Sequence, residues 1–374
     1  MQYRPASRFI DPDYTRKTRL LDATSVTRTP VLGTVLYDDS AIWRPVREYR
    51  RIHAAFPDVY AYHIDNPILS DEFIVHRDTT IFIDSSIHTA DKKGQNALQI
   101  ADRFSHALRA MPVAAPSEEY ADDSALVLHN EGGGTWGHYV VQNFPKVLLF
   151  RQHFPAGKVV VPRPHTDRQH SNFARLFDVY GIPQDHLIPV DRHTSYRFRE
   201  LILIDFMFDF PKQVAHPFTI DALAAFADST LHAEAQTVAK QAVFVARSED
   251  RHMRAIANQT ELDPVLDKYG VPARSLGAET VQQQIQAWQN SKLVISTLGS
   301  DLTNIIFGRE GTRVLSLSPD WFGDMFFYNL AVAKRMQWNE LRCGTLVEQA
   351  EVPHLSSFRV DPDLMDTMLE TLMA

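Results

Sequence analysis

The first segment that could do chemistry is a glycine-rich turn, Glu131–His138 (EGGGTWGH). It follows a predicted strand and leads directly into a predicted helix. Glycines let the backbone approach a ligand closely, and a helix N-terminus attracts an anion. His138 would lie in the first helical turn, where the positive helix end favours a neutral imidazole that can accept a proton. Packing of His138 against Trp136 is the non-catalytic interpretation.

A second turn, Leu298–Asn304 (LGSDLTN), lies between the apolar run KLVIST and a short predicted helix. It has the layout of a diphosphate-binding turn. It lacks the G-x-G-x-x-G and Walker motifs, so a nicotinamide dehydrogenase or a P-loop enzyme is not indicated. A third candidate is Arg247 at the end of the run AVFVAR, followed by Arg254 and Asn258. An arginine at a strand end can neutralise a diphosphate, whereas a solvated basic loop is the alternative.

Metal ligands are not indicated. Two Asp-Pro-Asp triplets, 11–13 and 361–363, imitate the D-x-D metal motif, but both lie near the chain ends, and Asp363 is explained as the N-cap of a terminal helix. The sixteen histidines are scattered without ligand spacing. Cys343 is the only cysteine, so the sequence excludes an intrachain disulfide and predicts an inert thiol.

The elements that must position these turns alternate along the chain from Ser124 onward. Apolar strand-like runs are separated by amphipathic helical segments, which indicates parallel sheets covered on both faces. Ligands bind such sheets beyond the carboxyl ends of the strands, where the candidate turns lie. The predicted strands are SALVLHN, KVVVP, HLIPV, FRELILID, AVFVAR, ARSLG, KLVIST and RVLSLS, and the predicted helices are 137–154, 168–180, 220–239, 259–269, 281–290, a short one after Asp301, and 322–335.

We therefore predict an α/β fold with two Rossmann-like, doubly wound parallel-sheet domains that face a cleft. The first domain spans 124–239 and the second spans 240–345. Residues 1–115 form an N-terminal α+β extension on the first domain, with strands near 59–64, 72–75 and 80–83, a helix over 97–111 and a polar linker at 112–123. Residues 346–374 form a tail whose helix, from 362 to 374, packs back across the domain junction.

Length and composition limit the classes of function. A chain of 374 residues corresponds to about two domains of ~150 residues. No apolar run approaches the ~18 residues of a membrane helix, and the first twenty residues lack the apolar core of a secretion signal, so we expect a cytoplasmic protein, with peripheral membrane contact left open. The net charge of −8, without a dense basic run, argues against nucleic acid as a partner.

Four motifs occur in a fixed order along the chain: G-x-x-G-H-Y-x-x-x-x-F-P-K-V at 134–147, F-V-A-R-S with R-x-x-x-N-x-x-E-L within 244–262, Q-Q-I-x-x-W at 283–288, and L-V-I-S-T-x-G-S-x-L-T-N-I-I-F at 293–307. Together they resemble glycosyltransferase family 61. The resemblance covers roughly 124–338 and leaves the first ~110 residues unmatched. It implies a GT-B fold and inverting transfer from a nucleotide sugar, for which a UDP-linked donor is expected, to a glycan in capsular or exopolysaccharide assembly.

The resemblance also assigns residues by position. His138 would be the base that faces the acceptor, and Glu131 the nearest carboxylate to orient it. The acceptor side would include Gly133, Gly134, Trp136 and Gln142. The donor site would be lined by Arg247, Arg254, Asn258, Gln284, Gly299, Ser300, Asp301 and Asn304. Because arginines and backbone N–H groups would meet the diphosphate, no metal or other cofactor is expected.

Three positions depart from the family pattern, and each removes an ionisable group. Leu298 stands where histidine is usual, Gln283 where glutamate is usual, and Gln142 where an acidic residue is usual. A catalytically impaired protein of the same fold that binds a carbohydrate or a nucleotide sugar therefore stays an alternative. A nucleotide-sugar epimerase is a third interpretation, and the sequence predicts no particular oligomeric state.

Overall fold

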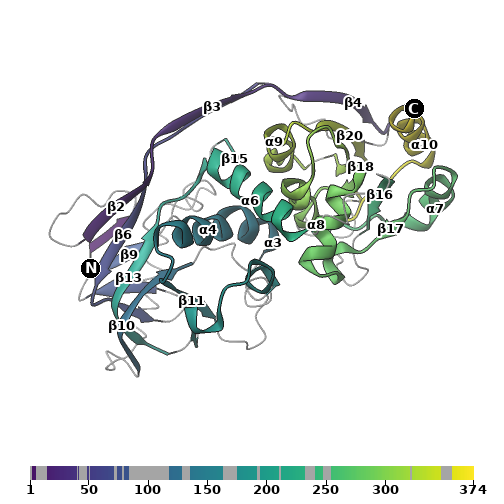
Figure 1. Ribbon diagram of the computed structural model, residues 1–374. Helices are drawn as coiled ribbons and strands as arrows, with labels where there is room; N and C mark the ends of the chain where they lie inside the picture. The colour runs from purple at the N-terminus through teal and green to yellow at the C-terminus, as the bar shows by residue number, and fades with distance from the viewer. Residues whose placement is uncertain are drawn as a thin grey trace. The chain divides into compact units, whose positions relative to one another are not determined.

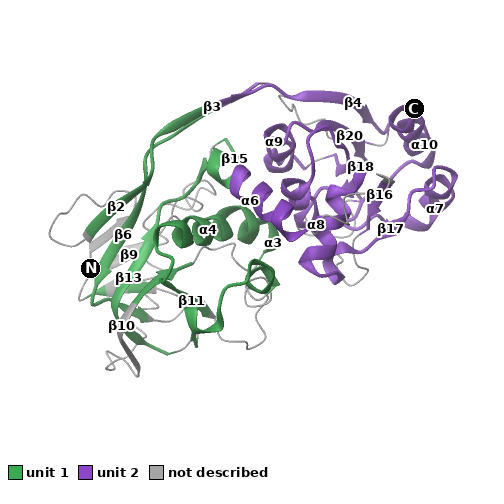
Figure 2. Cartoon of the chain, viewed as in Figure 1, with its two compact units in different colours: residues 1–25, 54–219 green, residues 26–53, 220–374 purple. Residues whose placement is uncertain are grey.

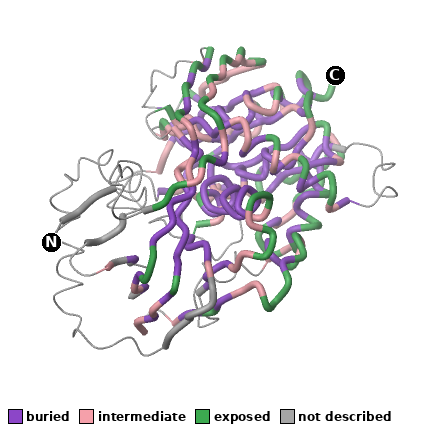
Figure 3. Tube along the Cα trace, turned by 60° about the vertical axis from the view of Figure 1, so that its left-hand side comes forward, coloured by how far each residue is buried: buried purple, intermediate pink, exposed green. Residues whose placement is uncertain are grey.

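The computed structural model describes residues 2–5, 15–39, 41, 49, 51–70, 74–77, 80–83, 118–128, 135–162, 175–191, 194–209, 212–231, 241–246, 254–320, 322–346 and 356–374. The chain forms two compact units, and each contains two separate stretches of chain (Figure 2). Unit 1 comprises Met1–Ser25 and Ala54–Thr219, and unit 2 comprises Val26–His53 and Ile220–Ala374. Buried residues concentrate in the strands and in the helices packed on them (Figure 3).

Unit 1 is built on a mixed ten-stranded sheet. The strands β13, β10, β11 and β12 are parallel, as the alternating pattern after Ser124 predicts. Strand β6 pairs antiparallel with β2 and β13, and β7 pairs antiparallel with β13 and β8; a short connection joins only β7 and β8 among these pairs. The bounds are β1 (Gln2–Pro5), β2 (Thr15–Leu21), β6 (Val59–Asp65), β7 (Ile68–Ser70), β8 (Ile74–Arg77), β9 (Thr80–Ile83), β10 (Glu118–Val127), β11 (Lys158–Pro162), β12 (Leu187–Val190) and β13 (Tyr196–Ile204).

The helix of unit 1 that carries His138 is interrupted. It consists of α3 (Trp136–His138), a π-helical turn η3 (Tyr139–Asn143) and α4 (Phe144–His153). In the π turn the N–H of Phe144 donates to the carbonyl of Tyr139, five residues back. The next residue, Pro145, has no N–H for the carbonyl four residues back, so the wider turn stands where the sequence predicts a kink.

The remaining elements of unit 1 are short. Residues 175–180 are helical, and they are followed by the single 3₁₀ turn η4 (Gln184–His186). Strands β14 (Phe208–Asp209) and β15 (Val214–Ala215) form a small hairpin, and α6 (Pro217–Thr230) then leads from unit 1 into unit 2. Strands β3 (Thr24–Arg28) and β5 (Ile52–Phe56) pair with each other and are divided between the units.

Unit 2 contains a six-stranded sheet in the order β17-β16-β18-β19-β20-β4, and every pair in it is parallel. Numbered by their order in the C-terminal part of the chain, the first five strands run 2-1-3-4-5, which is the order of flavodoxin-like doubly wound sheets. The bounds are β16 (Gln241–Val245), β17 (Ala273–Arg274), β18 (Ser291–Thr297), β19 (Arg313–Pro319), β20 (Gln337–Cys343) and β4 (Val31–Tyr37).

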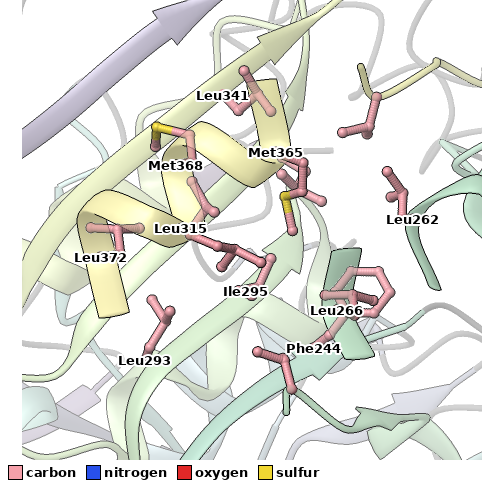
Figure 4. Close-up of a cluster of buried hydrophobic side chains, with 14 of the residues drawn as sticks. Phe244, Leu262, Leu266, Leu293, Ile295, Leu315, Leu341, Met365, Met368 and Leu372 are labelled. Carbon is pink, nitrogen blue, oxygen red and sulfur yellow. The ribbon is translucent and has the colours of Figure 1, made fainter. Parts of the chain in front are cut away.

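Helices cover both faces of this sheet. On one face, α7 (Gln259–Lys268) and α10 (Pro362–Met373) contact each other (Figure 1). Figure 4 shows Met365 and Met368 of α10 beside Leu315 and Ile295 of the strands. On the other face, Tyr328 of α9 (Phe326–Ala333) packs edge-on against Trp338 of β20. Side chains alternate along a strand, so Trp338 and Leu341, which joins the α10 cluster, point to opposite faces.

Two further helices complete the described part of unit 2. They are α8 (Val281–Gln289) and η7 (Ser300–Phe307), which contact each other, and a single 3₁₀ turn, η6 (Leu276–Ala278), precedes α8. The segment after Asp301 is helical as expected, but its hydrogen bonding is of the tighter 3₁₀ kind. The predicted class, a mixed α/β fold with parallel sheets and helices, is confirmed.

Several local predictions differ from the structure. The segment expected as a polar linker contributes the start of β10 at Glu118, because that strand extends alongside β13. The terminal helix is capped by Asp361, whose Oδ1 accepts from the N–H groups of Asp363 and Leu364, and not by Asp363. The predicted strand at ARSLG is only two residues long. Predicted helical residues 97–111, 168–174 and 232–239 lie outside the described residues.

Two strands of unit 2, β4 and β20, were not predicted. Strand β4 comes from the segment expected to belong to an N-terminal extension and pairs with β20. The two strands approach closely at Gly33, where an added Cβ would lie 2.0 Å from Oδ1 of Asn339. That oxygen accepts from the N–H of Thr34 at 2.8 Å. Glycine is therefore required at this contact.

Candidate active site

Four loops of unit 2 converge at the carboxyl edge of its sheet. The loop after β16 leads to Arg254, and the turn after β18 carries Asp301. A Cβ built on Gly277, which follows β17, would lie 3.8 Å from Oδ1 of Asp301. The loop after β19 brings Phe322 under Arg254. In this strand order β17 and β18 lie on opposite sides of β16, so the edge beyond β16 and β18 is where open parallel sheets bind ligands.

Arg254 has the properties of a residue held for an anion. Its guanidinium carbon lies 4.9 Å from the centroid of the Phe322 ring, and its backbone has a φ of 55°, which is uncommon for a non-glycine residue. Among the described residues it makes no hydrogen bond and no ion pair, and its Nε is buried without a partner. A buried N–H group without a partner lowers the stability of the fold, and hydrogen bonding to an anionic ligand would offset this loss.

The charges around Arg254 are acidic. Burial lowers the pKa of the Arg254 guanidinium, and the charges of Asp324 and Asp301 offset part of that effect. Asp324 is held in place because its Oδ1 accepts from the N–H of Phe326, at the start of α9, at 2.9 Å. The pKa of this guanidinium is thus perturbed, although it binds neither carboxylate. Groups with perturbed pKa values are common at functional sites.

Two buried amides lie next to this edge and bind each other. Asn304 Nδ2 donates to Gln284 Oε1 at 2.8 Å, and Gln284 Nε2 donates to the carbonyl of Glu279 at 3.1 Å. Both side chains are almost fully buried. The structure thus brings these two predicted donor residues together, where they hold η7 against α8.

Asn258 has a different setting. It precedes α7, and its Nδ2 donates to the carbonyl of Val360 at 2.8 Å and to Oε2 of Glu261 at 3.0 Å. Its Oδ1 accepts from the N–H of Val360 at 3.0 Å. Both amide protons are therefore used within unit 2, and the side chain ties the segment before α10 to the start of α7.

In unit 1, His138 is exposed on the first turn of the helix that follows the glycine-rich turn. Its Nδ1 lies 3.2 Å from Oε1 of Gln142, one turn further along. A carbonyl oxygen can only accept, so the proton of the neutral ring resides on Nδ1. Nε2 is then the unprotonated nitrogen, which is the form that a general base needs.

Residues 136–315 match the model of a known family, described as Glycosyltransferase 61. These residues identify a glycosyltransferase family 61 region. The match contains His138, Arg254 and the turn after β18, and it confirms the resemblance drawn from the four motifs. Similarity to this family supports glycosyltransferase activity and sugar substrates. No curated protein matches the chain.

Two departures from the family 61 pattern have a local explanation. Gln283 forms a capping box at the start of α8: its Oε1 accepts from the N–H of Thr280, and its own N–H donates to Oγ1 of Thr280. Glutamine serves this capping box as glutamate would. Gln142 supplies the acceptor that orients His138, as an acidic residue would, but without a charge. Leu298 is fully buried, and nothing in the structure explains its replacement of histidine.

Asn143 is a candidate site residue that the sequence did not single out. It ends the π turn next to Gln142 and is fully buried, and neither side-chain polar atom has a hydrogen-bond partner among the described residues. A π turn often marks a functional site. The signal available in the sequence was a pair of amides, Gln142 and Asn143, inside the otherwise apolar run YVVQNF.

Some of the other predicted site residues lie outside the described residues. Glu131, Gly133, Gly134 and Arg247 fall there. Trp136 is described, and the guanidinium of Arg175 lies 5.4 Å from the centroid of its ring. Gly299 is buried, and Ser300 begins η7. Within the described ranges, no group of three or more His, Cys, Asp or Glu side chains could hold a metal ion.

We expect Asn258→Ala to lower the free energy of unfolding by about 2 to 4 kcal/mol, because it leaves both backbone groups of Val360 without their buried partner. Nucleotide affinity should stay at the wild-type value. Thermal denaturation and calorimetric titration with UDP would measure the two effects, with the exposed Gln286→Ala as the amide control. An unchanged melting temperature together with weakened nucleotide binding would contradict this structural role and support Asn258 as a donor-site residue.

Proposed function

We propose that the protein is an inverting glycosyltransferase that moves a sugar from a UDP-linked donor to a hydroxyl group of a glycan acceptor. The observation that carries the proposal is the guanidinium of Arg254. It stands without a hydrogen bond or ion pair in the described part of the chain, where four loops of a doubly wound sheet converge. Anions of nucleotide ligands bind at such edges because the loops present cations and N–H groups.

The donor diphosphate would lie against Arg254 and the N–H groups of the turn from Gly299 to Asp301. Arg247, which follows β16 by two positions in the sequence, is proposed to add a second cation. A guanidinium can form two parallel hydrogen bonds with phosphate oxygens, which supports recognition of a diphosphate without a metal ion. No metal or other cofactor is therefore part of the proposal.

The reaction needs a base on the acceptor side. In the proposed step, Nε2 of His138 removes the proton of the acceptor hydroxyl while the oxygen attacks the anomeric carbon in line. The bond to the diphosphate breaks, and the negative charge that develops on the leaving group is met by Arg254. Gln142 fixes the ring and the tautomer, since its oxygen accepts from Nδ1. Glu131 is proposed as a carboxylate that helps to orient His138.

Further parts of the proposal concern architecture and pathway. We propose a GT-B arrangement, with unit 2 as the donor unit, unit 1 as the acceptor unit, and a role in capsular or exopolysaccharide assembly in the cytoplasm. The 2-1-3-4-5 order of unit 2 supports a nucleotide-binding half of this kind. None of the helices in the described residues combines the length and the apolar character that a membrane crossing needs.

The binding-only alternative is not favoured by the family match. It rested on three lost ionisable groups, of which Gln283 serves as a capping residue and Gln142 still orients the histidine. Release of UDP from a UDP-sugar, measured with and without a panel of glycan acceptors, separates transfer from binding alone. Binding with no turnover on any donor and acceptor pair would reinstate the alternative.

UDP is expected to stabilise the protein in the absence of divalent metal. At a hundred times its dissociation constant the ligand should add about 2.7 kcal/mol to the free energy of unfolding. For units of this size that corresponds to a rise in melting temperature of about 5 to 10 °C. Thermal denaturation with UDP in EDTA measures the effect, and uridine, which lacks the diphosphate, is the control. A rise that appears only after Mn²⁺ or Mg²⁺ is added would contradict a metal-free donor site.

A further inference from the structure

Strand β20 of unit 2 carries charged side chains where an apolar strand would be expected. Trp338, Glu340 and Arg342 alternate along it and share one face, the face that α9 covers. All three are fully buried, and the side chains of Glu340 and Arg342 are 0% and 1% exposed. Buried charges are expensive, so both must be compensated by partners.

The carboxylate of Glu340 is fully engaged. Its Oε1 pairs with Nε of Arg342 at 2.7 Å. Its Oε2 accepts from the indole N–H of Trp338 at 3.1 Å and from the hydroxyl of Tyr49. The ion pair is thus held in a single geometry from both ends, and the guanidinium of Arg342 cannot rotate without breaking it.

A second nitrogen of that guanidinium reaches the loop after β19. Nη1 of Arg342 donates to the carbonyl of Pro319 at 2.9 Å and to the carbonyl of Phe322 at 2.7 Å. The N–H of Phe322 donates to the same carbonyl of Pro319 at 3.1 Å. Arg342 therefore closes this turn from inside the sheet, and Phe322 is the residue whose ring lies under the guanidinium of Arg254.

We propose that Arg342 is a positioning residue of the donor site: it fixes the turn Pro319–Phe322 and thereby sets the place of the Phe322 ring that supports Arg254. The inference rests on the proposed function, since it concerns the site that would receive the nucleotide diphosphate. It assigns the buried pair of Glu340 and Arg342 to substrate binding, whereas a purely structural role would affect stability alone.

The chemistry of the contact explains why arginine is needed. The guanidinium binds Glu340 through Nε and both loop carbonyls through Nη1, and contacts from two separate nitrogens require a planar fork. A lysine could keep the ion pair, but its single nitrogen would have to leave the carbonyls of Pro319 and Phe322. An apolar pair at these two positions would pack the strand and leave the turn without any donor.

The test compares two variants. Arg342→Lys keeps the charge and loses the fork, and the double variant Glu340→Leu with Arg342→Met removes both charges, a replacement that cores often tolerate. We expect each to bind UDP about 10-fold more weakly by calorimetry. The KM for the donor should rise by a similar factor, with kcat changed less than 3-fold. The double variant should keep a cooperative thermal transition.

The matched control is Arg313→Met at the opposite, amino end of β19. Arg313 also donates to a backbone carbonyl, that of Leu372 at the end of α10, so its loss should lower the melting temperature without weakening UDP binding. If Arg342→Lys binds UDP as the wild type does, the inference is wrong. If the double variant fails to fold, Arg342→Lys decides alone.

A double-mutant cycle separates this inference from the proposed function. Once Arg254→Ala has removed the supported guanidinium, adding Arg342→Lys should weaken UDP binding no further, because both changes act through one contact. Additive losses would overturn the positioning role while leaving the proposed function in place. If Arg254→Ala itself binds UDP normally, the proposed donor site is wrong.

Discussion

His138→Ala is expected to lower the rate of sugar transfer by about 10²- to 10⁴-fold, because it removes the side chain that we propose takes the acceptor proton. The affinity for UDP should be unchanged, since His138 belongs to unit 1 and the proposed diphosphate contacts belong to unit 2. Initial rates with saturating donor and acceptor, together with calorimetric titration of UDP, would give both quantities. His138 is exposed, so the melting temperature should change little.

His138→Gln and Gln142→Leu are the companion variants. Glutamine at 138 keeps size and hydrogen bonding but cannot accept the proton, so it should be as inactive as alanine. Gln142→Leu leaves the imidazole in place but removes the oxygen that holds Nδ1, and an intermediate loss of rate is expected. Substantial turnover by His138→Gln would remove His138 from the mechanism. A large fall in melting temperature with normal turnover per folded molecule would instead support packing on Trp136.

Arg254→Ala should weaken UDP binding by about 10- to 150-fold, the loss that corresponds to one charge-assisted hydrogen bond of roughly 1.5 to 3 kcal/mol. Arg254→Met should weaken binding similarly while raising the melting temperature, because a half-buried cation whose buried Nε has no hydrogen bond is replaced by an apolar side chain. Calorimetric titration and thermal denaturation of the same preparations would show the two opposite effects.

The control for Arg254 is Arg359→Met in the same unit. Arg359 is exposed and pairs with Glu261, so its replacement should alter neither UDP affinity nor, by more than about 1 kcal/mol, stability. Equal affinities for wild type and Arg254→Ala would refute the assignment. A lower melting temperature for Arg254→Met would show that the guanidinium has a structural partner and is not held for a ligand.

The sequence predicted the elements whose pattern is purely apolar. KLVIST and RVLSLS became β18 and β19, and the order of strands and helices was sufficient to place the turn after β18 at the carboxyl edge of a parallel sheet. Arg254 was singled out by its motif. Its isolation from every hydrogen-bond partner in the described residues depends on three-dimensional packing, which no spacing along the chain reveals.

Strand β20 shows why elements that bury polar residues could not be predicted from the sequence. Its sequence, QWNELRC, has the polarity of a surface loop, yet every residue from Trp338 to Cys343 is buried. The charges cancel within the strand, since Glu340 pairs with Arg342. Oε2 of Glu340 also accepts from Tyr49, and Nη1 of Arg342 donates to the loop after β19. A pattern method that counts apolar residues has no means of detecting that two polar positions satisfy each other.

The pairing of β4 with β20 has a consequence for how this protein folds during its synthesis on the ribosome. Thr34 and Asn339 bind each other although 305 positions separate them. Strand β4 is therefore synthesised early but cannot pair until β20 has been translated, near the end of the chain. Its apolar residues Val31 and Leu32 remain exposed even in the folded protein. The second sheet gains its edge strand last. A nascent chain stalled before Gln337 would present an unpaired strand, a state in which binding by a chaperone would prevent wrong pairing.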